Sequence, residues 1–386
     1  MKVVSWHPIL TDHQSYTLEA LQQAAKCPLT VYVAKTEHPS RQLQGWVNRH
    51  AASLSPQLIP QKGWVKYIIQ QLLAHRDAVH LFGSPFEQPR LIVTLLLAIA
   101  MGLRVFLISE SYSPISAGYL TDKHKLINWA KALLRPILYR FYGAMLSRRI
   151  AGVFAISPLA ASQYRSIGIA KEKIFPFGYF VPRSERLRSE PPATDSKKTG
   201  LRLIFIGTLI TTKGLDVLIE AVRNLNGNGA AVTVDAYGYG DSHQFDFDQS
   251  TVRYCGLIPF GESQAVIADY DALVLPSRYD GWGVVVNEAL MAGVPVICSD
   301  RVGAGAVIEK WRCGVIFTSE DVSDLEHKVN AFANAPEHLE KMRLAARNAG
   351  AALEPDVAGR YMFDVLRDDL SNAMQPKPSC PWYDYD

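Results

Sequence analysis

Apolar and polar positions alternate in blocks along the chain. Short apolar runs are separated by longer stretches with helix signals. The runs are typical of buried strands, and the stretches between them of covering helices. Strands are predicted at 2–6, 29–34, 78–82, 104–109, 152–156 and 174–175, and again at 201–206, 231–236, 252–254, 272–275, 294–298 and 314–317. This alternation favours an α/β fold with mostly parallel sheets.

One stretch interrupts the pattern. Residues 183–200 ("RSERLRSEPPATDSKKTG") are polar, charged and proline-bearing, which is typical of a linker between domains. A chain of 386 residues, 48% of them hydrophobic, also exceeds the usual size of a single core. We therefore expect one domain over 1–182 and a second beginning at 201. The Pro-, Tyr- and Asp-rich end, 373–386, is predicted to be a flexible tail.

Composition narrows the class of protein. The net charge of +3 is too small to indicate nucleic-acid binding by itself, and five cysteines without C-x-x-C spacing indicate neither a zinc site nor a disulfide framework. Reduced thiols and the lack of an export signal at the first strand suggest a cytoplasmic protein. The longest apolar run, 91–103, is shorter than the roughly 20 residues of a membrane span, so we expect a buried helix there.

The stretch 277–300 ("SRYDGWGVVVNEALMAGVPVICSD") carries the most chemistry. It places two carboxylates, Asp280 and Glu288, eight positions apart between two predicted strands. Its middle must be a loop and a short helix at the edge of a parallel sheet, where α/β folds bind ligands. Gly281 and Gly283 let the backbone approach a ligand closely. The helix expected to begin near Val284 points its amino end toward an anion.

Five blocks of the second half, in this order, resemble the retaining GT-B-fold glycosyltransferases of the large E-x7-E group (glycosyltransferase family 4, glycosyl transferases group 1). They are "FIGTLITTKGLDVLIEAV" (205–222), "AYGYGDS" (236–242), "VRYCGLI" (252–258), "YDALVLPSRYDGWGVVVNEALMAGVPVICSD" (270–300) and "GAG" (303–305). "GRYMFDVLRDDL" (359–370) is similar to the family's terminal helix, which crosses back to the first domain. The resemblance therefore divides the second half into a domain over 201–355 and a crossing helix over 356–372.

The resemblance implies two facing Rossmann-like, doubly wound domains with a deep cleft between them. It implies transfer of a sugar from a nucleotide diphosphate sugar, UDP ahead of GDP, to a glycan or lipid-linked glycan in polysaccharide or glycolipid biosynthesis. In the family's usual mechanism the acceptor attacks from the face that the diphosphate leaves, and a diphosphate oxygen takes the proton. The sugar's configuration is then retained, and no side-chain base is required.

Site residues follow from the resemblance by position. Glu288 would bind the ribose hydroxyls, and Asp280 the donor sugar, although the family usually has the longer Glu at that position. Lys213 would neutralise the departing diphosphate. Thr208 stands where the family often has an arginine, so we expect Arg278 to supply a second positive charge. The other predicted donor contacts are Gly207, Gly238, Ile258, Gly281, Trp282, Gly283 and Val284.

The first domain should bind the acceptor. Its candidates at predicted strand ends are His7, His13, His80 and Glu110, with Glu110 also a catalytic candidate beside Lys213 and Asp280. The family often has histidine where Glu110 falls, so a direct role cannot be carried over. A single histidine is also compatible with a purely structural role.

We expect neither a metal nor another cofactor. The acidic pairs Asp246-x-Asp248 and Asp269-x-Asp271 mimic the D-x-D motif that holds a divalent ion in other glycosyltransferases. The first pair lies in a polar loop and the second precedes a strand where the motif should end one. Both are therefore interpreted as solvated acids, and Lys213 with the helix end can take over the metal's electrostatic role.

Two other classes of protein remain open. An NAD-dependent oxidoreductase is suggested by the Gly-x-Gly of 236–242 and by the Y-x-x-x-K pattern at 119–123. The former lacks the third glycine of the dinucleotide fingerprint, and the first glycine of the chain is Gly45, far beyond the first strand. A non-catalytic nucleotide-sugar-binding protein stays open because Asp280 and Thr208 depart from the family pattern.

Residues 123–152 form a basic segment with seven Lys or Arg and no Asp or Glu. Its apolar residues recur at helical spacing, which suits a helix on an anionic membrane surface. The alternative is an ordinary helix with an apolar core stripe and a basic outer face, bent at Pro136. The residues expected to face a membrane are Lys123, Lys125, Trp129, Lys131, Arg135 and Arg140, which would make the protein peripheral on the inner face of the membrane.

Overall fold

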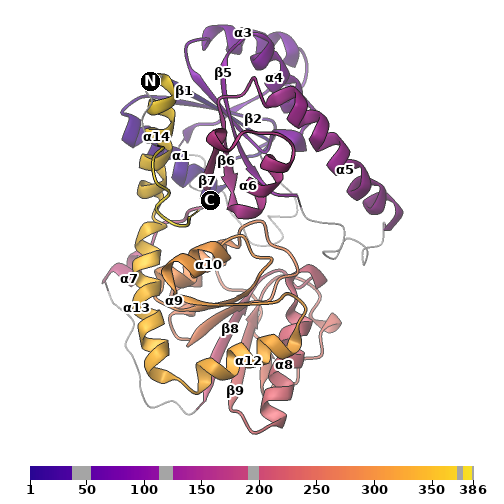
Figure 1. Ribbon diagram of the computed structural model, residues 1–386, viewed down its shortest axis with the longest axis vertical. Helices are drawn as coiled ribbons and strands as arrows, with labels where there is room; N and C mark the ends of the chain where they lie inside the picture. The colour runs from indigo at the N-terminus through magenta and orange to yellow at the C-terminus, as the bar shows by residue number, and fades with distance from the viewer. Residues whose placement is uncertain (37–53, 113–124, 190–199, 372–376, 385–386) are drawn as a thin grey trace.

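A computed structural model describes residues 1–36, 54–112, 125–189, 200–371 and 377–384. The chain forms two lobes along the longest axis of the molecule, each built around a parallel sheet with helices packed against it (Figure 1). This arrangement confirms the α/β prediction and the pair of Rossmann-like domains.

The first sheet has the strand order β3-β2-β1-β4-β5-β6-β7 within the described residues, and all of its pairings are parallel. Its strands are β1 (Val3–His7), β2 (Leu29–Val33), β3 (Gln57–Leu58), β4 (Val79–Gly83), β5 (Arg104–Glu110), β6 (Gly152–Ile156) and β7 (Ile174–Phe177). Its helices are α1 (Asp12–Ala25), α3 (Trp64–Ala74), α4 (Pro89–Ala100), α5 (Lys125–Leu146) and α6 (Ser157–Ser166). The two-residue β3 was not predicted, because both its residues are exposed and form no apolar run.

The second sheet has the order β10-β9-β8-β11-β12-β13, again with every pairing parallel. Its strands are β8 (Leu201–Ile206), β9 (Val232–Tyr237), β10 (Val252–Tyr254), β11 (Ala272–Leu275), β12 (Val296–Ser299) and β13 (Gly314–Phe317). Its helices are α8 (Leu215–Gly227), α9 (Ser263–Ile267), α10 (Val284–Met291), α11 (Gly305–Trp311), α12 (Val322–Ala333) and α13 (Pro336–Ala352). Short 3-10 turns lie at Pro85–Glu87 (η2), Lys171–Lys173 (η3), Thr211–Lys213 (η4) and Ser242–Gln244 (η5).

The apolar run 91–103 is a helix, α4, that packs on the first sheet. It buries Leu91, Leu95 and Ala98 completely or almost so. Among the residues that the structure describes, no helix combines the length and apolar character that a bilayer crossing requires.

Helix α14 (Pro355–Ser371) connects the second lobe to the first (Figure 1). Gly359 is pressed against α1, where an added Cβ would lie 2.5 Å from the carbonyl carbon of Ala20. Nearer its end, the Asp369 carboxylate pairs with Arg104 at 2.8 Å. The helix therefore belongs by sequence to the second half and by packing to the first lobe.

Two segments expected to lack structure are partly ordered. A short helix, α7 (Glu185–Ser189), lies inside the expected linker and buries Leu187. The flexible-tail prediction for 373–386 is wrong for residues 377–384, because the side chains of Trp382 and Tyr383 are completely buried. Proline- and aspartate-rich composition resembles a solvated tail, but the two aromatic rings find apolar partners only in the assembled fold.

Candidate functional site

Lys213 and Asp280 meet where the second sheet ends. The Lys213 ammonium lies 2.6 Å from the Asp280 carboxylate, and both side chains keep some exposure, 23% and 17%. Gly214 brings them together: it adopts φ +68° at the start of α8, and an added Cβ would lie 1.9 Å from the carbonyl oxygen of Pro276. A left-handed glycine is thus required for the turn after β8 to close on the end of β11.

The loop from Asp280 to Gly283 is held by the segment that follows β12. The Asp280 N–H donates to the Arg301 carbonyl at 3.0 Å, and the Gly303 N–H donates back to the Asp280 carbonyl at 3.0 Å. Gly283 ends the loop with φ +90° and caps α10, which begins at Val284 as predicted. The amides at the start of α10 therefore follow Asp280 closely in the chain, after a loop of fixed geometry.

Glu288 lies on the second turn of α10. Its carboxylate accepts a hydrogen bond of 2.7 Å from the Ser263 hydroxyl of α9. Burial raises the pKa of Glu288 to about 7, and the bond from Ser263 offsets only part of that rise. Ligand hydroxyl groups that donate hydrogen bonds to this carboxylate would stabilise its charged form and lower its pKa.

The remaining predicted donor contacts are placed as follows. Gly207 and Gly238 bring the turns after β8 and β9 together, since a Cβ on Gly238 would lie 1.7 Å from the Gly207 carbonyl oxygen. Thr208, Ile258 and Val284 are partly exposed, in the loop after β8, the loop before α9 and the first turn of α10.

Trp282 differs from its prediction as a donor contact. Its indole is 1% exposed, and it donates from Nε1 to Asn287 at 2.8 Å. The ring packs against Gly178 of the first lobe, where an added Cβ would be 2.5 Å from it. Only the backbone of Trp282 can face a ligand, because its side chain belongs to the contact between the lobes.

Arg278 does not supply the free cation expected of it. Its guanidinium donates to Asp216 at 2.7 and 2.8 Å, to Glu320 at 2.9 Å and to the Thr211 carbonyl at 2.6 Å. These bonds tie the loop after β11 to the turn before α8. Its role is therefore to organise the Lys213 turn, which residue type alone could not distinguish from phosphate binding.

Glu110 reaches the second lobe from the end of β5. A Cβ on Gly281 would lie 2.6 Å from Glu110 Oε2, so this carboxylate is in contact with the Asp280 loop. The Tyr179 hydroxyl donates to its other oxygen. Tyr279, next to Asp280 in the chain, donates to the Ser111 carbonyl at 2.9 Å. The two tyrosines were not predicted, although the position of Tyr279 beside the motif was a usable signal.

The three histidines have different surroundings. His80 is a core residue and not an acceptor contact: Trp6 donates to its Nδ1 at 3.2 Å, so Nε2–H donates to the His75 carbonyl at 3.1 Å. Burial lowers the pKa of His80 to about 4. The prediction that it faces the cleft is wrong, because His80 lies near the amino end of β4, a strand that is buried on both faces.

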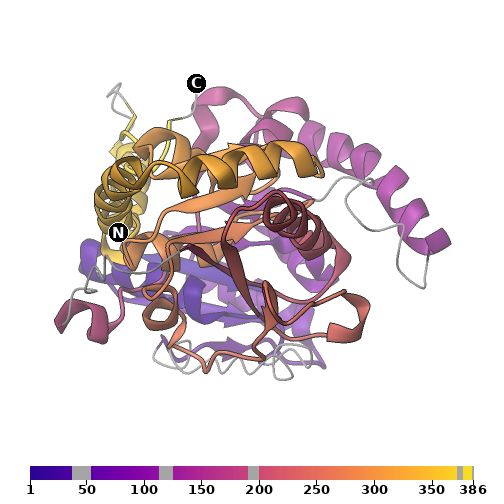
Figure 2. The same cartoon turned by 90° about the horizontal axis from the view of Figure 1, so that it is seen from below.

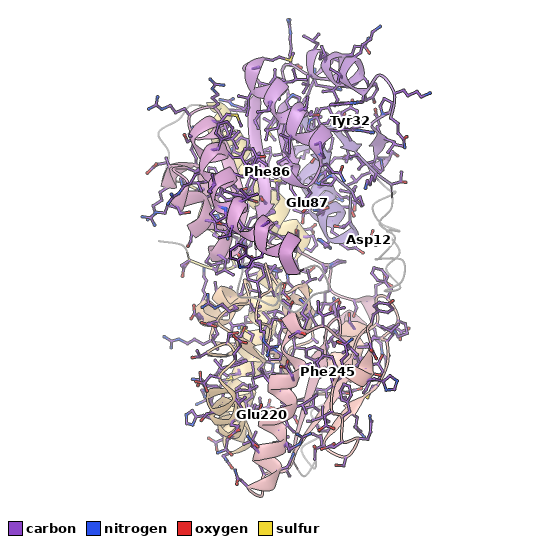
Figure 3. All side chains as sticks on the ribbon, turned by 90° about the vertical axis from the view of Figure 1, so that its right-hand side faces the viewer. Asp12, Tyr32, Phe86, Glu87, Glu220 and Phe245 are labelled. Atoms are coloured by element: carbon purple, nitrogen blue, oxygen red, sulfur yellow. The ribbon has the colours of Figure 1, made fainter. Side chains whose placement is uncertain are left out.

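His7 and His13 lie near the end of β1, closer to the second lobe. His7 is hydrogen-bonded through Nε2 to the Ser5 hydroxyl at 2.7 Å, and burial lowers its pKa to about 4, so the ring is neutral. His13 lies edge-on to the Tyr179 ring, with centroids 4.4 Å apart. Its neighbour Asp12 begins α1 on the side of the first lobe that faces the second (Figure 3).

Helix α5 exposes apolar side chains instead of burying them. Trp129, Leu133, Leu134, Ile137, Leu138 and Phe141 are between 44% and 66% exposed. The helix extends outward beyond the first lobe in two perpendicular views (Figures 1 and 2). Its base is anchored by Tyr142, which stacks on Phe86 with centroids 4.5 Å apart; Phe86 is labelled in Figure 3. The alternative of an ordinary core stripe is therefore wrong for these six residues.

The basic residues assigned to this surface are only partly described. Arg140 is exposed on α5, and Lys125, Lys131 and Arg135 fall within the helix. Lys123 lies outside the described residues. The helix continues through Pro136.

Neither acidic pair is arranged as a metal site. Asp246 pairs with Arg223 at 2.7 Å, and Asp248 accepts three backbone N–H groups of the following turn. Asp271 accepts from the Arg202 amide and from Arg343. Within the described ranges, no group of three or more His, Cys, Asp or Glu could hold a metal ion.

Known proteins resemble this chain in the sequence of its second half and in its fold. Residues 188–349 match the family described as Glycosyl transferases group 1. Glycogen synthase of Mycobacterium tuberculosis is 29% identical over 165 residues, which are 41% of this chain and 40% of that protein. The putative colanic acid biosynthesis glycosyltransferase WcaL of Escherichia coli is 28% identical over 244 residues, 60% of this chain and 58% of that one. The chain thus spans about two fifths to three fifths of these relatives.

The fold is shared more widely than the sequence. The crystal structure of HepE from Anabaena in complex with UDP superposes with a TM-score of 0.67 at 13% identity, covering 97% of this chain and 100% of that one. Residues 188–349 are thus similar to the family Glycosyl transferases group 1, and the two facing parallel sheets have the GT-B fold.

Proposed function

We propose that this protein is a retaining glycosyltransferase that transfers a sugar from a UDP-sugar to a glycan or lipid-linked glycan in polysaccharide biosynthesis. The observation that carries the proposal is the Lys213–Asp280 pair beside the start of α10, with Glu288 one to two turns further along. Relatives named for glycogen, colanic acid and teichuronic acid synthesis support the substrate class. HepE has also been crystallised with UDP-glucose, which supports a uridine donor.

Each donor group meets a complementary side chain in this proposal. Glu288 accepts the ribose hydroxyls, and its raised pKa falls again as those donors stabilise the charged form. The Lys213 ammonium and the amide groups at the start of α10 bind the diphosphate. Asp280 accepts from hydroxyls of the sugar, and Glu110 lies against the same loop at Gly281. The sugar then lies between two carboxylates, one from each lobe.

Transfer needs charge stabilisation more than proton transfer by a side chain. As the bond to the sugar breaks, negative charge builds on the diphosphate, and Lys213 with the helix end stabilises it. A diphosphate oxygen takes the acceptor proton on the same face, which retains the configuration. The carboxylates of Asp246, Asp248 and Asp271 are held in structural bonds, which supports a metal-independent reaction.

The test is turnover of a panel of nucleotide sugars, followed by mass spectrometry with and without glycan acceptors. The proposal expects consumption of one or a few UDP-sugars and a product with retained configuration. Binding of UDP-sugars without turnover of any would favour a non-catalytic binding protein. NAD binding that UDP does not displace would favour an oxidoreductase.

We further propose that α5 holds the enzyme on an anionic membrane surface, as suits a lipid-linked acceptor. Six exposed apolar side chains lie on a helix in a segment that has seven basic and no acidic residues. Each Lys or Arg near such a surface contributes about 1 kcal/mol, and the attraction is screened over about 8 Å at physiological salt. Apolar insertion and charge attraction then both hold the helix at the membrane.

Sedimentation with vesicles tests this second proposal. The protein should bind vesicles that contain anionic phospholipid, release with added salt, and lose binding when Lys131, Arg135 and Arg140 are replaced by glutamate. The matched control places the same three charge reversals at Lys62, Lys66 and Arg76, exposed on the same lobe. Binding that fails on all vesicles while the protein dimerises through α5 would instead identify a second copy as the partner.

A further inference from the structure

Residues 380–384, near the carboxyl end of the chain, contact both lobes, and we call them the strap. The Tyr383 hydroxyl accepts from the Phe177 N–H at 3.1 Å and lies 3.1 and 3.3 Å from the carbonyl oxygens of Phe177 and Ala155. Ala155 is on β6 and Phe177 on β7, which pair at the edge of the first sheet. The Tyr383 hydroxyl thus supplies a partner to backbone groups of both strands.

The same strap contacts the second lobe. The Trp382 carbonyl accepts from Trp311 Nε1 at 3.2 Å, and the Lys310 ammonium donates to the Cys380 carbonyl at 3.1 Å and to Asp384 at 3.0 Å. Both Lys310 and Trp311 end α11. Residues 380–384 are thus bonded at once to the first sheet and to a helix of the second domain.

Between these contacts the Tyr383 ring packs against the buried Trp282, and the Trp382 ring reaches Trp282 through Phe180. The Trp382 ring lies 4.7 Å from Phe180, and the Tyr383 ring 6.2 Å from Trp282. Gly178 leaves room for the Trp282 indole on the first lobe. The Trp282 carbonyl in turn accepts from the Ala304 N–H at 2.8 Å, just before α11 begins. The side chain between Gly281 and Gly283 is therefore enclosed by the first lobe, the strap and its own helix α10.

We infer that the strap is a positioning element for the Asp280–Gly283 loop, with Trp382 and Tyr383 as positioning residues that act through Trp282. A loop with two glycines has little stiffness of its own. Holding its one large side chain fixes the backbone that presents Asp280 and the start of α10. The effect on donor binding rests on the proposed function; the effect on loop order does not.

Hydrogen exchange tests the loop directly. We would compare the full chain with a chain that ends at Pro376, with Tyr383→Phe, and with the matched control Tyr67→Phe, whose hydroxyl lies on the exposed surface of the first lobe. The inference expects faster exchange of the amides of Asp280, Gly303 and Ala304, largest in the shortened chain, with no change in β9 or β10. Faster exchange confined to 174–180 would overturn it, because the strap would then serve only the sheet edge.

Calorimetry with UDP adds a functional readout. The shortened chain should bind UDP about tenfold more weakly, comparable to losing one hydrogen bond to a charged group, at temperatures well below its unfolding. Trp382→Phe should retain more affinity than Trp382→Ala, since a smaller ring still fills part of the site. Equal UDP affinity in all variants would overturn the positioning role. If the full chain itself binds no UDP, the proposed function fails, and the exchange result still decides whether the strap orders the loop.

Discussion

Replacing Glu288 with glutamine should strengthen the fold at alkaline pH while it weakens donor binding. Burial raises the pKa of this carboxyl from its ordinary 4.5 to about 7. The folded state therefore holds the proton more tightly than the unfolded chain does. The resulting stabilisation is fully present below pH 4.5 and is lost as the pH rises through 7.

The size of the effect follows from the shift. At about 1.36 kcal/mol per pKa unit, a rise from 4.5 to about 7 corresponds to at most about 3 kcal/mol of lost stability, and the side chain's remaining exposure reduces it. Glutamine does not titrate, and its amide oxygen can still accept the bond from Ser263. The stability difference between the Glu288→Gln variant and the parent should therefore shift toward the variant by about 1–3 kcal/mol between pH 4.5 and pH 8.

Donor binding should change in the opposite sense. Loss of the charged acceptor should weaken UDP binding by roughly 1.5–3 kcal/mol, the range for a hydrogen bond to a charged group. In the parent protein the proton must leave Glu288 before the ribose binds, so UDP affinity should rise up to about tenfold per pH unit below pH 7 and then level off. The variant should show no such dependence.

Scanning calorimetry and UDP titration at pH 5, 6, 7 and 8 measure both effects. Glu220→Gln is the matched control, since Glu220 is exposed on α8 of the same lobe (Figure 3). A stability difference that is equal at pH 5 and pH 8 would refute the buried, titrating carboxyl. UDP affinity unchanged by Glu288→Gln would refute its contact with the ribose.

Three further predictions follow from the site and the core. Lys213→Ala should lower turnover by on the order of 10²–10³ while EDTA leaves the parent's activity intact; full loss with EDTA, restored by magnesium, would contradict the metal-free proposal. Gly281→Ala should lower turnover by roughly 10², because its Cβ would lie 2.6 Å from Glu110 Oε2; unchanged turnover would exclude Glu110 from the reaction. His80→Ala should destabilise the fold by about 2–4 kcal/mol in thermal unfolding without changing UDP affinity in titration. The control His243→Ala, at an exposed position, should change neither the stability nor the UDP affinity.

Local sequence determined the elements and their order. Strands of a parallel sheet are buried on both faces, so their apolar runs are continuous and stand out from the helices around them. All the predicted strands are present, and each of their ends lies within two residues of the predicted position. Helix α10 begins at Val284 as expected. The same pattern placed Asp280 after β11 and Glu288 on the following helix, because a short glycine-bearing loop permits little else.

Tertiary structure decided which of these side chains are free to act. Arg278 and Lys213 are both cations beside the same turn. Only the positions of Asp216 and Glu320 commit Arg278 to the scaffold, while Lys213 pairs with Asp280 at the Asp280–Gly283 loop. Likewise, no local pattern distinguishes Trp282 in the lobe contact from a tryptophan that stacks on a ligand.

The end of the chain and helix α5 show, in opposite ways, that the sequence pattern alone does not predict which apolar side chains are buried. Trp382 and Tyr383 looked like parts of a tail and are core, whereas the apolar stripe of α5 looked as much like core as membrane surface and is exposed. Hydrophobicity fixes what a side chain gains from leaving water, but not where its partners are. Those partners come from residues more than two hundred positions away, as Phe177 does for Tyr383, and only the folded chain brings them together.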